Sequence, residues 1–282
     1  MQWQIGDARI TRVRETDLNH FTAEGYLRIQ RRDLDPYRSW MKPYLGPNDE
    51  LLMSVHAFCI EADGLRIVVD TCIGNDKQFG PSPFMEIFNG LKTSFLDALG
   101  RAGFGRDAVD VVVSTHLHVD HVGWNTVLEG GALRPTFRHA RYLMSKPDLA
   151  YWEANPGSHN PFEISVRPLL ALGRVDAVDS EHRISPSVSL WPSPGHTPGH
   201  VSVRIESRGE VALITGDMLH TPVQLARPEW SSIADTDGKE AERSRLRLLS
   251  EIGAGAALVL GTHFPGRTAG RVLRDGASWR FE

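Results

Sequence analysis

The chain has 282 residues, which is long enough to bury a core without disulfides or a metal ion to hold it together. Its net charge of −4 excludes a strongly basic nucleic-acid surface, and its 41% hydrophobic and 23% charged residues are ordinary for a folded globular protein. Two cysteines, Cys59 and Cys72, argue against a secreted disulfide scaffold, whereas twelve histidines are an unusually large number.

The beginning of the sequence carries charges early and lacks an apolar core, so it does not resemble a secretory or transit signal. No apolar run approaches the ~20 residues that a membrane-spanning helix needs. We therefore expect a cytoplasmic protein without membrane association.

The first half of the chain holds short apolar or alternating runs that are typical of strands. Strands are predicted at 8–14, 54–61, 65–70 and 109–114. An apolar stripe predicts a helix over 86–102. Residues 16–50 are rich in proline and aromatic residues, and we expect an excursion that is either a surface segment or a lid or oligomerisation element.

The second half repeats this mixture of strands and helices. Strands are predicted at 141–144, 187–191, 200–206, 211–215, 257–260 and 278–281. A helix is predicted over 237–252, with Asp235 or Asp237 available as its cap. Two groups of strands, each with helices, predict an α+β fold of two packed mixed sheets in a single domain, with halves at about 1–140 and 141–282.

The run THLHVDH follows the continuous apolar strand at 109–114 and concentrates polar side chains there. Buried polar groups need partners, and a metal ion supplies them to several side chains at once. His116 and His118 are two residues apart, so on an extended segment they face the same way. Asp120 and His121 come next, where a turn of the chain lets them face a second site.

Gly123 is expected to allow that turn, and further candidate ligands follow later strands or loops. His196 lies in the loop PGHTPGH, Asp217 follows the strand at 211–215, and His263 follows the strand at 257–260. Loops at strand ends are where sheets with helical connections place their sites.

These motifs resemble the ligand motifs of the metallo-β-lactamase superfamily of hydrolases, and they occur in the order of that family. The resemblance covers about residues 50–270 and implies an αββα sandwich. The family's DTG signature stands here as Asp70-Thr71-Cys72, with Cys72 in place of the glycine.

The resemblance implies two divalent metal ions, with ligand types that suit zinc and also iron, manganese or cobalt. The implied ligands are His116, His118 and His196 in one site, Asp120, His121 and His263 in the other, and Asp217 as the bridge between them. A metal-bound hydroxide would attack a lactone or ester carbonyl, and Asp120 would also act as a catalytic proton carrier.

The complete ligand set looks like the N-acyl-homoserine lactonases and the methyl parathion hydrolases. Lactonases carry a tyrosine three residues after the bridging aspartate, whereas this chain has His220 there, as phosphotriesterase-like relatives do. His220 is therefore a second candidate catalytic residue, which either hydrogen-bonds to the substrate or packs behind the metal ligands. The expected partner is a small-molecule ester or lactone, with phosphotriester hydrolysis as a side activity, and we expect no nucleic acid and a homodimer built through residues 16–50.

Two enzymatic alternatives remain open within the family. A glyoxalase II-like thioester hydrolase shares the GHTxGH loop, although Arg267, Arg271 and Arg274 only weakly imitate its basic glutathione-binding segment. A mononuclear iron dioxygenase tends to leave the second site unfilled, whereas all its ligands are present here. A non-catalytic member of the fold is the third alternative, but such proteins usually lose ligands.

Other residues are expected to support the site. Asp70, Thr115, Thr215 and Thr262 are expected to orient ligands, and His200 is expected to have a structural role. A partly apolar pocket is predicted from Phe84, Phe88, Trp124, Trp230 and Phe264.

Overall fold

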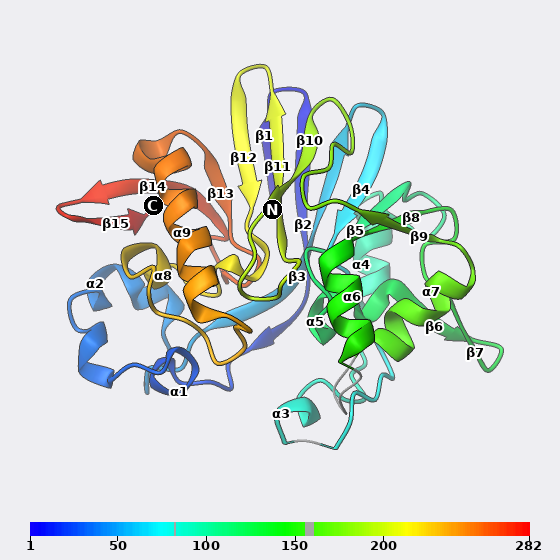
Figure 1. Ribbon diagram of the computed structural model, residues 1–282, viewed down its shortest axis with the longest axis horizontal. Helices are drawn as coiled ribbons and strands as arrows, with labels where there is room; N and C mark the ends of the chain where they lie inside the picture. Colours follow the sequence, from blue (N-terminus) through cyan, green and yellow to red (C-terminus); the bar gives the residue numbers. More distant parts are fainter. Residues whose placement is uncertain (82, 156–160) are drawn as a thin grey trace.

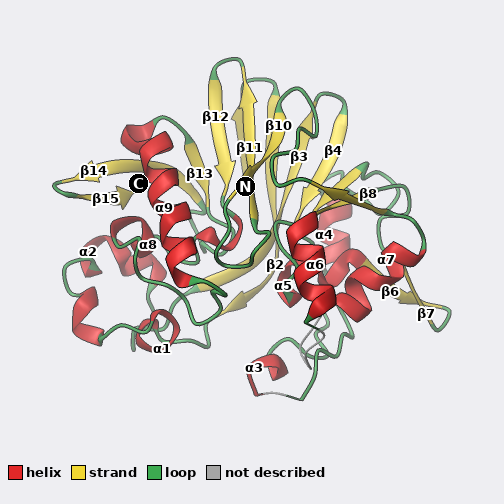
Figure 2. Ribbon diagram, in the orientation of Figure 1, coloured by secondary structure: helices red, strands yellow, loops and turns green. Residues whose placement is uncertain are grey.

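A computed structural model describes residues 1–81, 83–155 and 161–282 of the chain. Two β-sheets stack face to face, and helices cover their outer surfaces on both sides (Figures 1 and 2). This arrangement confirms the predicted α+β class and its αββα sandwich of two mixed sheets.

The first sheet has seven strands in the order β1-β2-β3-β4-β5-β8-β9. Neighbours are antiparallel from β1 to β4 and parallel from β4 to β9. Their bounds are β1 (Gln2–Ile5), β2 (Ala8–Leu18), β3 (Met53–Ala62), β4 (Leu65–Val69), β5 (Val111–Val113), β8 (Arg141–Ser145) and β9 (Val175–Val178). The predicted strands of this region are confirmed, but β8 and β9 belong to the first sheet because they pair in parallel with β5. The sheet boundary therefore falls after Val178, later than the expected division of the halves at 140.

The second sheet has six strands in the order β10-β11-β12-β13-β14-β15, and only β12 and β13 form a parallel pair among its described neighbours. Its strands are β10 (Val188–Pro192), β11 (Val201–Ser207), β12 (Glu210–Ile214), β13 (Leu258–Leu260), β14 (Ala269–Asp275) and β15 (Ser278–Phe281). A separate hairpin joins β6 (Thr126–Glu129) and β7 (Ala132–Pro135). The sequence did not predict β1, β9, β14 or this hairpin, because these strands are short or polar residues interrupt their alternation.

Both faces of the central strands are buried. In β3, Phe58 and Ile60 belong to the core between the two sheets, where they meet residues such as Val203. Ala57 and Cys59 point to the opposite face and pack with the helical layer. Side chains alternate across a strand, so continuous apolar runs are the pattern expected for strands covered on both sides.

The helices are short except for α9, which is 15 residues long. The α-helices are α1 (Ala23–Leu27), α2 (Arg38–Met41), α3 (Pro83–Glu86), α4 (Phe95–Arg101), α5 (Val119–Val122), α6 (Lys146–Ala154), α7 (Arg167–Ala171), α8 (Val223–Ala226) and α9 (Gly238–Ile252). Tighter or wider turns are η1 (Arg31–Leu34), η2 (Lys42–Tyr44), η3 (Gly123–Asn125), η4 (Phe162–Val166), η5 (Gly216–Met218) and η6 (Gly253–Gly255). The predicted helix over 237–252 is confirmed, and the Asp237 side chain caps it by accepting from the backbone of Lys239 and Glu240.

The predicted helix over 86–102 is wrong in its first part, because the helix α4 within this range begins only at Phe95 and ends at Arg101. The side chain of Asn89 accepts a hydrogen bond from the Phe79 amide at 2.7 Å and donates one to the Gly80 carbonyl at 2.9 Å. These bonds hold residues 87–90 in a turn against the preceding loop, and tertiary contacts therefore override the helical periodicity.

Residues 19–50 form several short helical segments, including α1 and α2, that lie beside one edge of the sandwich (Figure 1). Buried side chains hold this segment against the rest of the protein: Tyr26, Leu27, Leu34, Met41 and Tyr44. Arg31 and Arg38 both form ion pairs with the buried carboxylate of Asp49.

Within the described ranges, the structure contains no helix that is both long enough and apolar enough to cross a membrane.

Candidate metal centre

The histidine-rich loop begins directly after β5 and is held by a carboxylate that follows β4. Asp70 accepts hydrogen bonds from the Thr115 amide at 2.8 Å and from the Thr115 hydroxyl at 2.9 Å. In this loop His116 Nε2 lies 3.0 Å from His118 Nδ1. The two imidazoles therefore face the same point, as their two-residue spacing predicted.

Residues from the second sheet complete a first group of ligand atoms. His196 Nε2 lies 2.9 Å from His118 Nδ1 and 3.4 Å from Asp217 Oδ2. The distance from Asp217 Oδ2 to His116 Nε2 is 3.8 Å. Four side chains from both halves of the protein thus converge within 4.8 Å of one another, which is the spacing of ligands around one metal ion.

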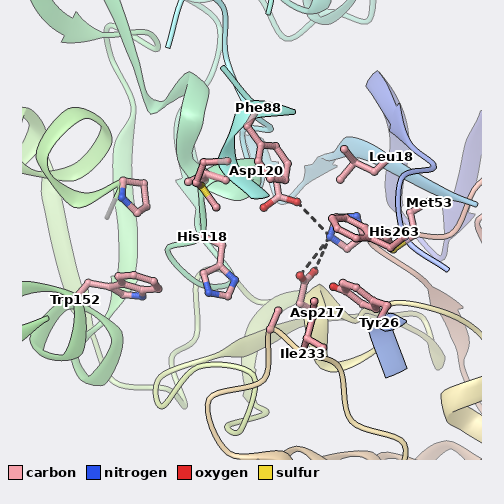
Figure 3. A pocket seen from close by; sticks show the side chains of 15 residues that line it. Leu18, Tyr26, Met53, Phe88, His118, Asp120, Trp152, Asp217, Ile233 and His263 are labelled. Atoms are coloured by element: carbon pink, nitrogen blue, oxygen red, sulfur yellow. Dashed lines mark hydrogen bonds and ion pairs between the residues drawn. The ribbon is translucent and has the colours of Figure 1, made fainter. Parts of the chain in front are cut away.

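A second group lies on the other side of the Asp217 carboxylate. His263 Nε2 is 3.5 Å from Asp120 Oδ2 and 3.1 Å from Asp217 Oδ1, and Figure 3 shows both contacts. His121 Nε2 is 3.7 Å from Asp120 Oδ2 and 3.3 Å from Asp217 Oδ1. Asp217 therefore presents Oδ2 to the first group and Oδ1 to the second.

The outward nitrogens of four histidines each face a hydrogen-bond acceptor. The pairs are His116 Nδ1 with Thr115 Oγ1 at 3.1 Å, His121 Nδ1 with Asp70 Oδ2 at 2.9 Å, His196 Nδ1 with Asp235 Oδ1 at 2.9 Å, and His263 Nδ1 with the Ser54 carbonyl at 3.2 Å. Each acceptor favours a proton on Nδ1, which leaves the lone pair on Nε2 directed inward. This is the arrangement in which proteins orient metal-binding histidines.

The inward-facing atoms of the two groups are better suited to binding cations than to hydrogen-bonding with one another. Burial and the neighbouring imidazoles lower the pKa of His116 and His118, so both rings are neutral and offer lone pairs at about 3 Å separation. His121 Nε2 and Asp217 Oδ1 are buried, and neither has a hydrogen-bond partner among the described residues. Burial raises the pKa of Asp217, but the neighbouring His121, His263 and His220 outweigh this and lower it overall, which keeps the carboxylate charged. The neighbouring carboxylates in turn raise the pKa of His121 and His263. This combination of imidazoles and carboxylates suits two divalent cations.

Two glycines allow the close approaches that build this site. Gly216 has a φ of +55°, and a Cβ there would lie 2.5 Å from His200 Nε2. His200 Nε2 accepts a hydrogen bond from the Asp217 amide at 2.8 Å, so His200 supports the backbone of the bridging carboxylate. Gly123 has an ordinary helical φ of −59°, but a Cβ would lie 1.6 Å from the Ile73 carbonyl oxygen. It is therefore required for close packing and not, as expected, for a turn.

His220 lies close to the ligand groups but behind them. Its Nε2 is 3.3 Å from Asp217 Oδ2, and its ring contacts those of His196 and His263 at centroid distances of 4.9 and 5.9 Å. Its exposed fraction is 1%, and it is not among the described residues that line the adjacent cavity. The ring of Tyr26 covers it edge-on at 5.3 Å.

Two supporting residues were not recognised from the sequence in this role. Asp235 was expected to be at most a helix cap, but it accepts from His196 while Asp237 caps α9. Arg245 on α9 is fully buried; it lies 3.7 Å from Asp235 and donates to the carbonyls of Met218 and Pro228. The only sequence signal was the presence of two aspartates where one cap suffices.

The residues expected to orient ligands have different environments. Asp70 and Thr115 hold His121 and His116 as described above. Thr215 donates to the Gly216 carbonyl at 2.8 Å and so stabilises the turn before Asp217. Thr262 is buried beside His263, and its hydroxyl has no hydrogen-bond partner within the described part of the chain.

A cavity of about 350 Å³ opens onto the two groups and is mostly apolar (Figure 3). Its lining is Leu18, Phe21, Tyr26, Met53, Met85, Phe88, His118, Val119, Asp120, Trp152, Pro161, Asp217, Ile233, Ala234 and His263. The prediction of an apolar pocket is correct for Phe88, whereas Trp124, Trp230 and Phe264 pack into the buried core instead. The Phe84 side chain lies outside the part of the chain that the structure describes.

Comparison with known sequences identifies related proteins. The family model described as "Metallo-beta-lactamase superfamily" matches residues 52–263. An N-acyl homoserine lactonase from a Bacillus species is 27% identical over 187 residues, which cover 63% of this chain and 68% of the lactonase. A probable metallo-hydrolase of Mycobacterium tuberculosis is 26% identical over 181 residues, or 58% of this chain and 56% of that protein.

Solved structures resemble the whole chain. The hydrolase AbOPH of the beta-lactamase superfamily superposes with a TM-score of 0.81 at 23% identity, covering 99% of this chain and 95% of the other. AidC, described as a dizinc quorum-quenching lactonase in complex with a product, superposes with a TM-score of 0.80 at 19% identity, covering 100% and 96% of the two chains. At these identities the likeness establishes the fold.

Proposed function

The chain belongs to the metallo-β-lactamase superfamily, and from this membership we propose that it is a dinuclear metal-dependent hydrolase of small lactones or esters. The observation that carries the proposal is the completeness of both ligand groups around Asp217. The first cation would be held by His116, His118 and His196, and the second by Asp120, His121 and His263. Asp217 would contact both. This is the ligand set expected from the sequence.

Two divalent cations held by these residues would lower the pKa of a bound water molecule and polarise a substrate carbonyl. The protein's own groups orient the reaction. Asp120 is the ligand carboxylate with the more exposed side chain, at 12% compared with 5% for Asp217, and it lines the cavity. In our proposal Asp120 therefore accepts the proton of the attacking water and returns it to the leaving alkoxide.

The two interpretations of His220 predict different surroundings. A residue that hydrogen-bonds to the substrate should line the cavity, whereas a packed residue should be covered. Its burial and its contact with Asp217 support the second interpretation. We therefore propose that His220 positions Asp217 and does not touch the substrate.

The lining of the cavity supports a neutral acyl substrate. Among the described lining residues, the charged side chains are the proposed ligands, and most of the others are aliphatic, aromatic or methionine. A glutathione thioester carries carboxylates, and the lining residues that the structure describes include no lysine or arginine to bind them. Arg267, Arg271 and Arg274, the weak candidates for that purpose, lie beside other grooves. A mononuclear iron dioxygenase and a non-catalytic protein are disfavoured because the second ligand group is complete.

A hydrolysis screen of the metal-loaded protein tests this proposal. The substrates are homoserine lactones of several acyl lengths, aryl esters, a phosphotriester and a glutathione thioester, with the metal content of the same sample measured alongside. We expect hydrolysis of lactones or esters at close to two metal equivalents per chain. Activity restricted to the thioester would support the alternative, and one equivalent of iron without hydrolysis would contradict the proposal.

A further inference from the structure

Tyr26 differs from the other polar residues that line the cavity. The remaining lining side chains with oxygen atoms are Asp120 and Asp217, which belong to the two ligand groups. Tyr26 is thus the described lining residue that brings a hydroxyl group to the cavity without belonging to either group. It comes from α1, in the segment at 16–50 to which the sequence assigned no definite function.

The hydroxyl of Tyr26 is directed toward the proposed metal ligands. The side chain is 6% exposed, and in Figure 3 its hydroxyl end points toward the carboxylate of Asp217. The ring is fixed by neighbours on two sides, Phe21 and His220, each at a centroid distance of 5.3 Å. The backbone is fixed as well, because the Ile233 amide donates to the Tyr26 carbonyl at 2.8 Å.

A short chain of hydrogen bonds joins this hydroxyl to a proposed metal ligand. The Ser232 side chain hydrogen-bonds to the Tyr26 hydroxyl. The Ser232 hydroxyl donates to Asp235 Oδ1 at 3.0 Å, and Asp235 Oδ1 also accepts from His196 Nδ1. Since the Ser232 hydroxyl donates its hydrogen to Asp235, its oxygen is left to accept a hydrogen bond from the Tyr26 hydroxyl.

From this placement we propose that Tyr26 is a catalytic residue, whose hydroxyl donates a hydrogen bond to the carbonyl oxygen of the bound lactone or ester. The inference rests on the proposed function. Ser232 and the substrate oxygen compete for a single hydroxyl proton. A neutral carbonyl oxygen competes weakly, but the same oxygen becomes a stronger acceptor as negative charge develops on it in the tetrahedral intermediate. The hydrogen bond from Tyr26 therefore strengthens during the reaction. An interaction that is stronger in the transition state than in the bound substrate lowers the activation barrier, whereas one of equal strength in both only improves binding.

The variant Tyr26→Phe removes this hydroxyl while retaining the ring that packs on Phe21 and His220. We expect kcat for an aryl ester or lactone to fall roughly 100-fold, as for the loss of a single oxyanion donor, with KM changed less than about threefold. Metal content and thermal midpoint should equal those of the wild type. Tyr37→Phe is the matched control, because Tyr37 is in the same segment but packs against Trp40 and Trp230 outside the cavity, and it should leave kcat unchanged.

A binding measurement separates this role from a structural one. The two probes are an alkyl trifluoromethyl ketone, whose hydrate resembles the tetrahedral intermediate, and the matching methyl ketone, which resembles the substrate. Calorimetry should show that Tyr26→Phe weakens the first probe by roughly 10-fold or more and the second by less than about threefold. Equal weakening of both probes, or an unchanged kcat, would overturn the inference while leaving the proposed function intact. A wild-type protein that hydrolyses neither substrate class overturns both.

Discussion

The His121 imidazole and the Asp70 carboxylate meet at 2.9 Å, Nδ1 to Oδ2, although 51 residues separate them in the chain. The same carboxylate accepts from Thr115, so it holds the loop that carries His116. A single buried side chain therefore orients ligands of both proposed metal positions.

Asp70→Asn should weaken binding of the second cation by 10- to 100-fold, roughly the loss seen when a partner of a metal-ligating histidine is removed. The amide cannot accept from His121 as strongly as a carboxylate, and the ring loses its fixed protonation on Nδ1. Competitive titration with a chromophoric chelator measures the affinity. Asp179→Asn, at an exposed carboxylate paired with Lys146, is the control. Equal affinities in the two variants would refute the assigned function of Asp70.

Asp217→Asn should lower kcat/KM for ester hydrolysis by far more than ~tenfold while the chain still folds, because one oxygen of the bridge becomes an amide nitrogen that cannot ligate. His118→Ala should have a similar effect by removing the nitrogen that lies closest to both His116 and His196. Steady-state kinetics and far-UV circular dichroism provide the measurements. Asp275→Asn, at the exposed last residue of β14, is the comparison variant, and full activity in both site variants would rule out the proposed centre.

Removal of metal by a chelator should lower the thermal midpoint, and addition of zinc should restore it. Without the cation, the inward-facing nitrogens and carboxylate oxygens would face one another directly. A ligand that binds the folded state and is present at 100 times its Kd stabilises that state by ~2.7 kcal/mol, so removing it lowers the midpoint. Differential scanning fluorimetry before and after readdition follows the change. A midpoint that does not respond to either step would speak against metal at these groups.

The free energy of unfolding should rise between about pH 8 and pH 10.5 because Lys77 loses its proton at a lower pH in the folded chain than in the unfolded chain. Burial lowers the pKa of Lys77 from 10.5 to about 8, and its ammonium donates to the carbonyl and hydroxyl of Thr126. In this window the unfolded chain keeps the proton that the folded chain has released, so raising the pH favours folding. Urea unfolding at pH 7 and pH 10 measures the difference. The rise should be smaller in Lys77→Met than in Lys92→Met, where the lysine is exposed, and equal rises would contradict the assignment.

Gly123→Ala should destabilise the protein by at least ~2 kcal/mol, because the added Cβ would collide with the Ile73 carbonyl and the backbone must move. The expected displacement affects the loop from Asp70 to Gly74 and, through it, His121. Gly105→Ala is the matched control, since a Cβ there meets no atom within 4 Å. Chemical unfolding of the two variants compares them directly, and similar free energies would disprove the packing argument.

Sequence patterns predicted most of the strands and the long helix because those signals are local. Continuous apolar runs such as the one at 109–114 require burial on both faces, and a 3.6-residue stripe with an aspartate before it requires a capped helix. Elements with weaker local signals were missed or misplaced, because contacts with residues elsewhere in the chain decide their structure. At residues 87–90 a local helical pattern yields to the hydrogen bonds of Asn89, which depend on a loop ten residues away.

The sequence by itself determined which side chains are the candidate ligands, since few residue types bind metal and these follow the ends of predicted strands. The structure brings all seven of them into two adjoining groups. Tertiary structure alone decided what surrounds them. Asp235 and Arg245 support His196, His220 is covered, and Tyr26 reaches the cavity from the other end of the chain. No spacing rule joins positions so far apart, because their contact exists only when the two sheets stack and close the site between them.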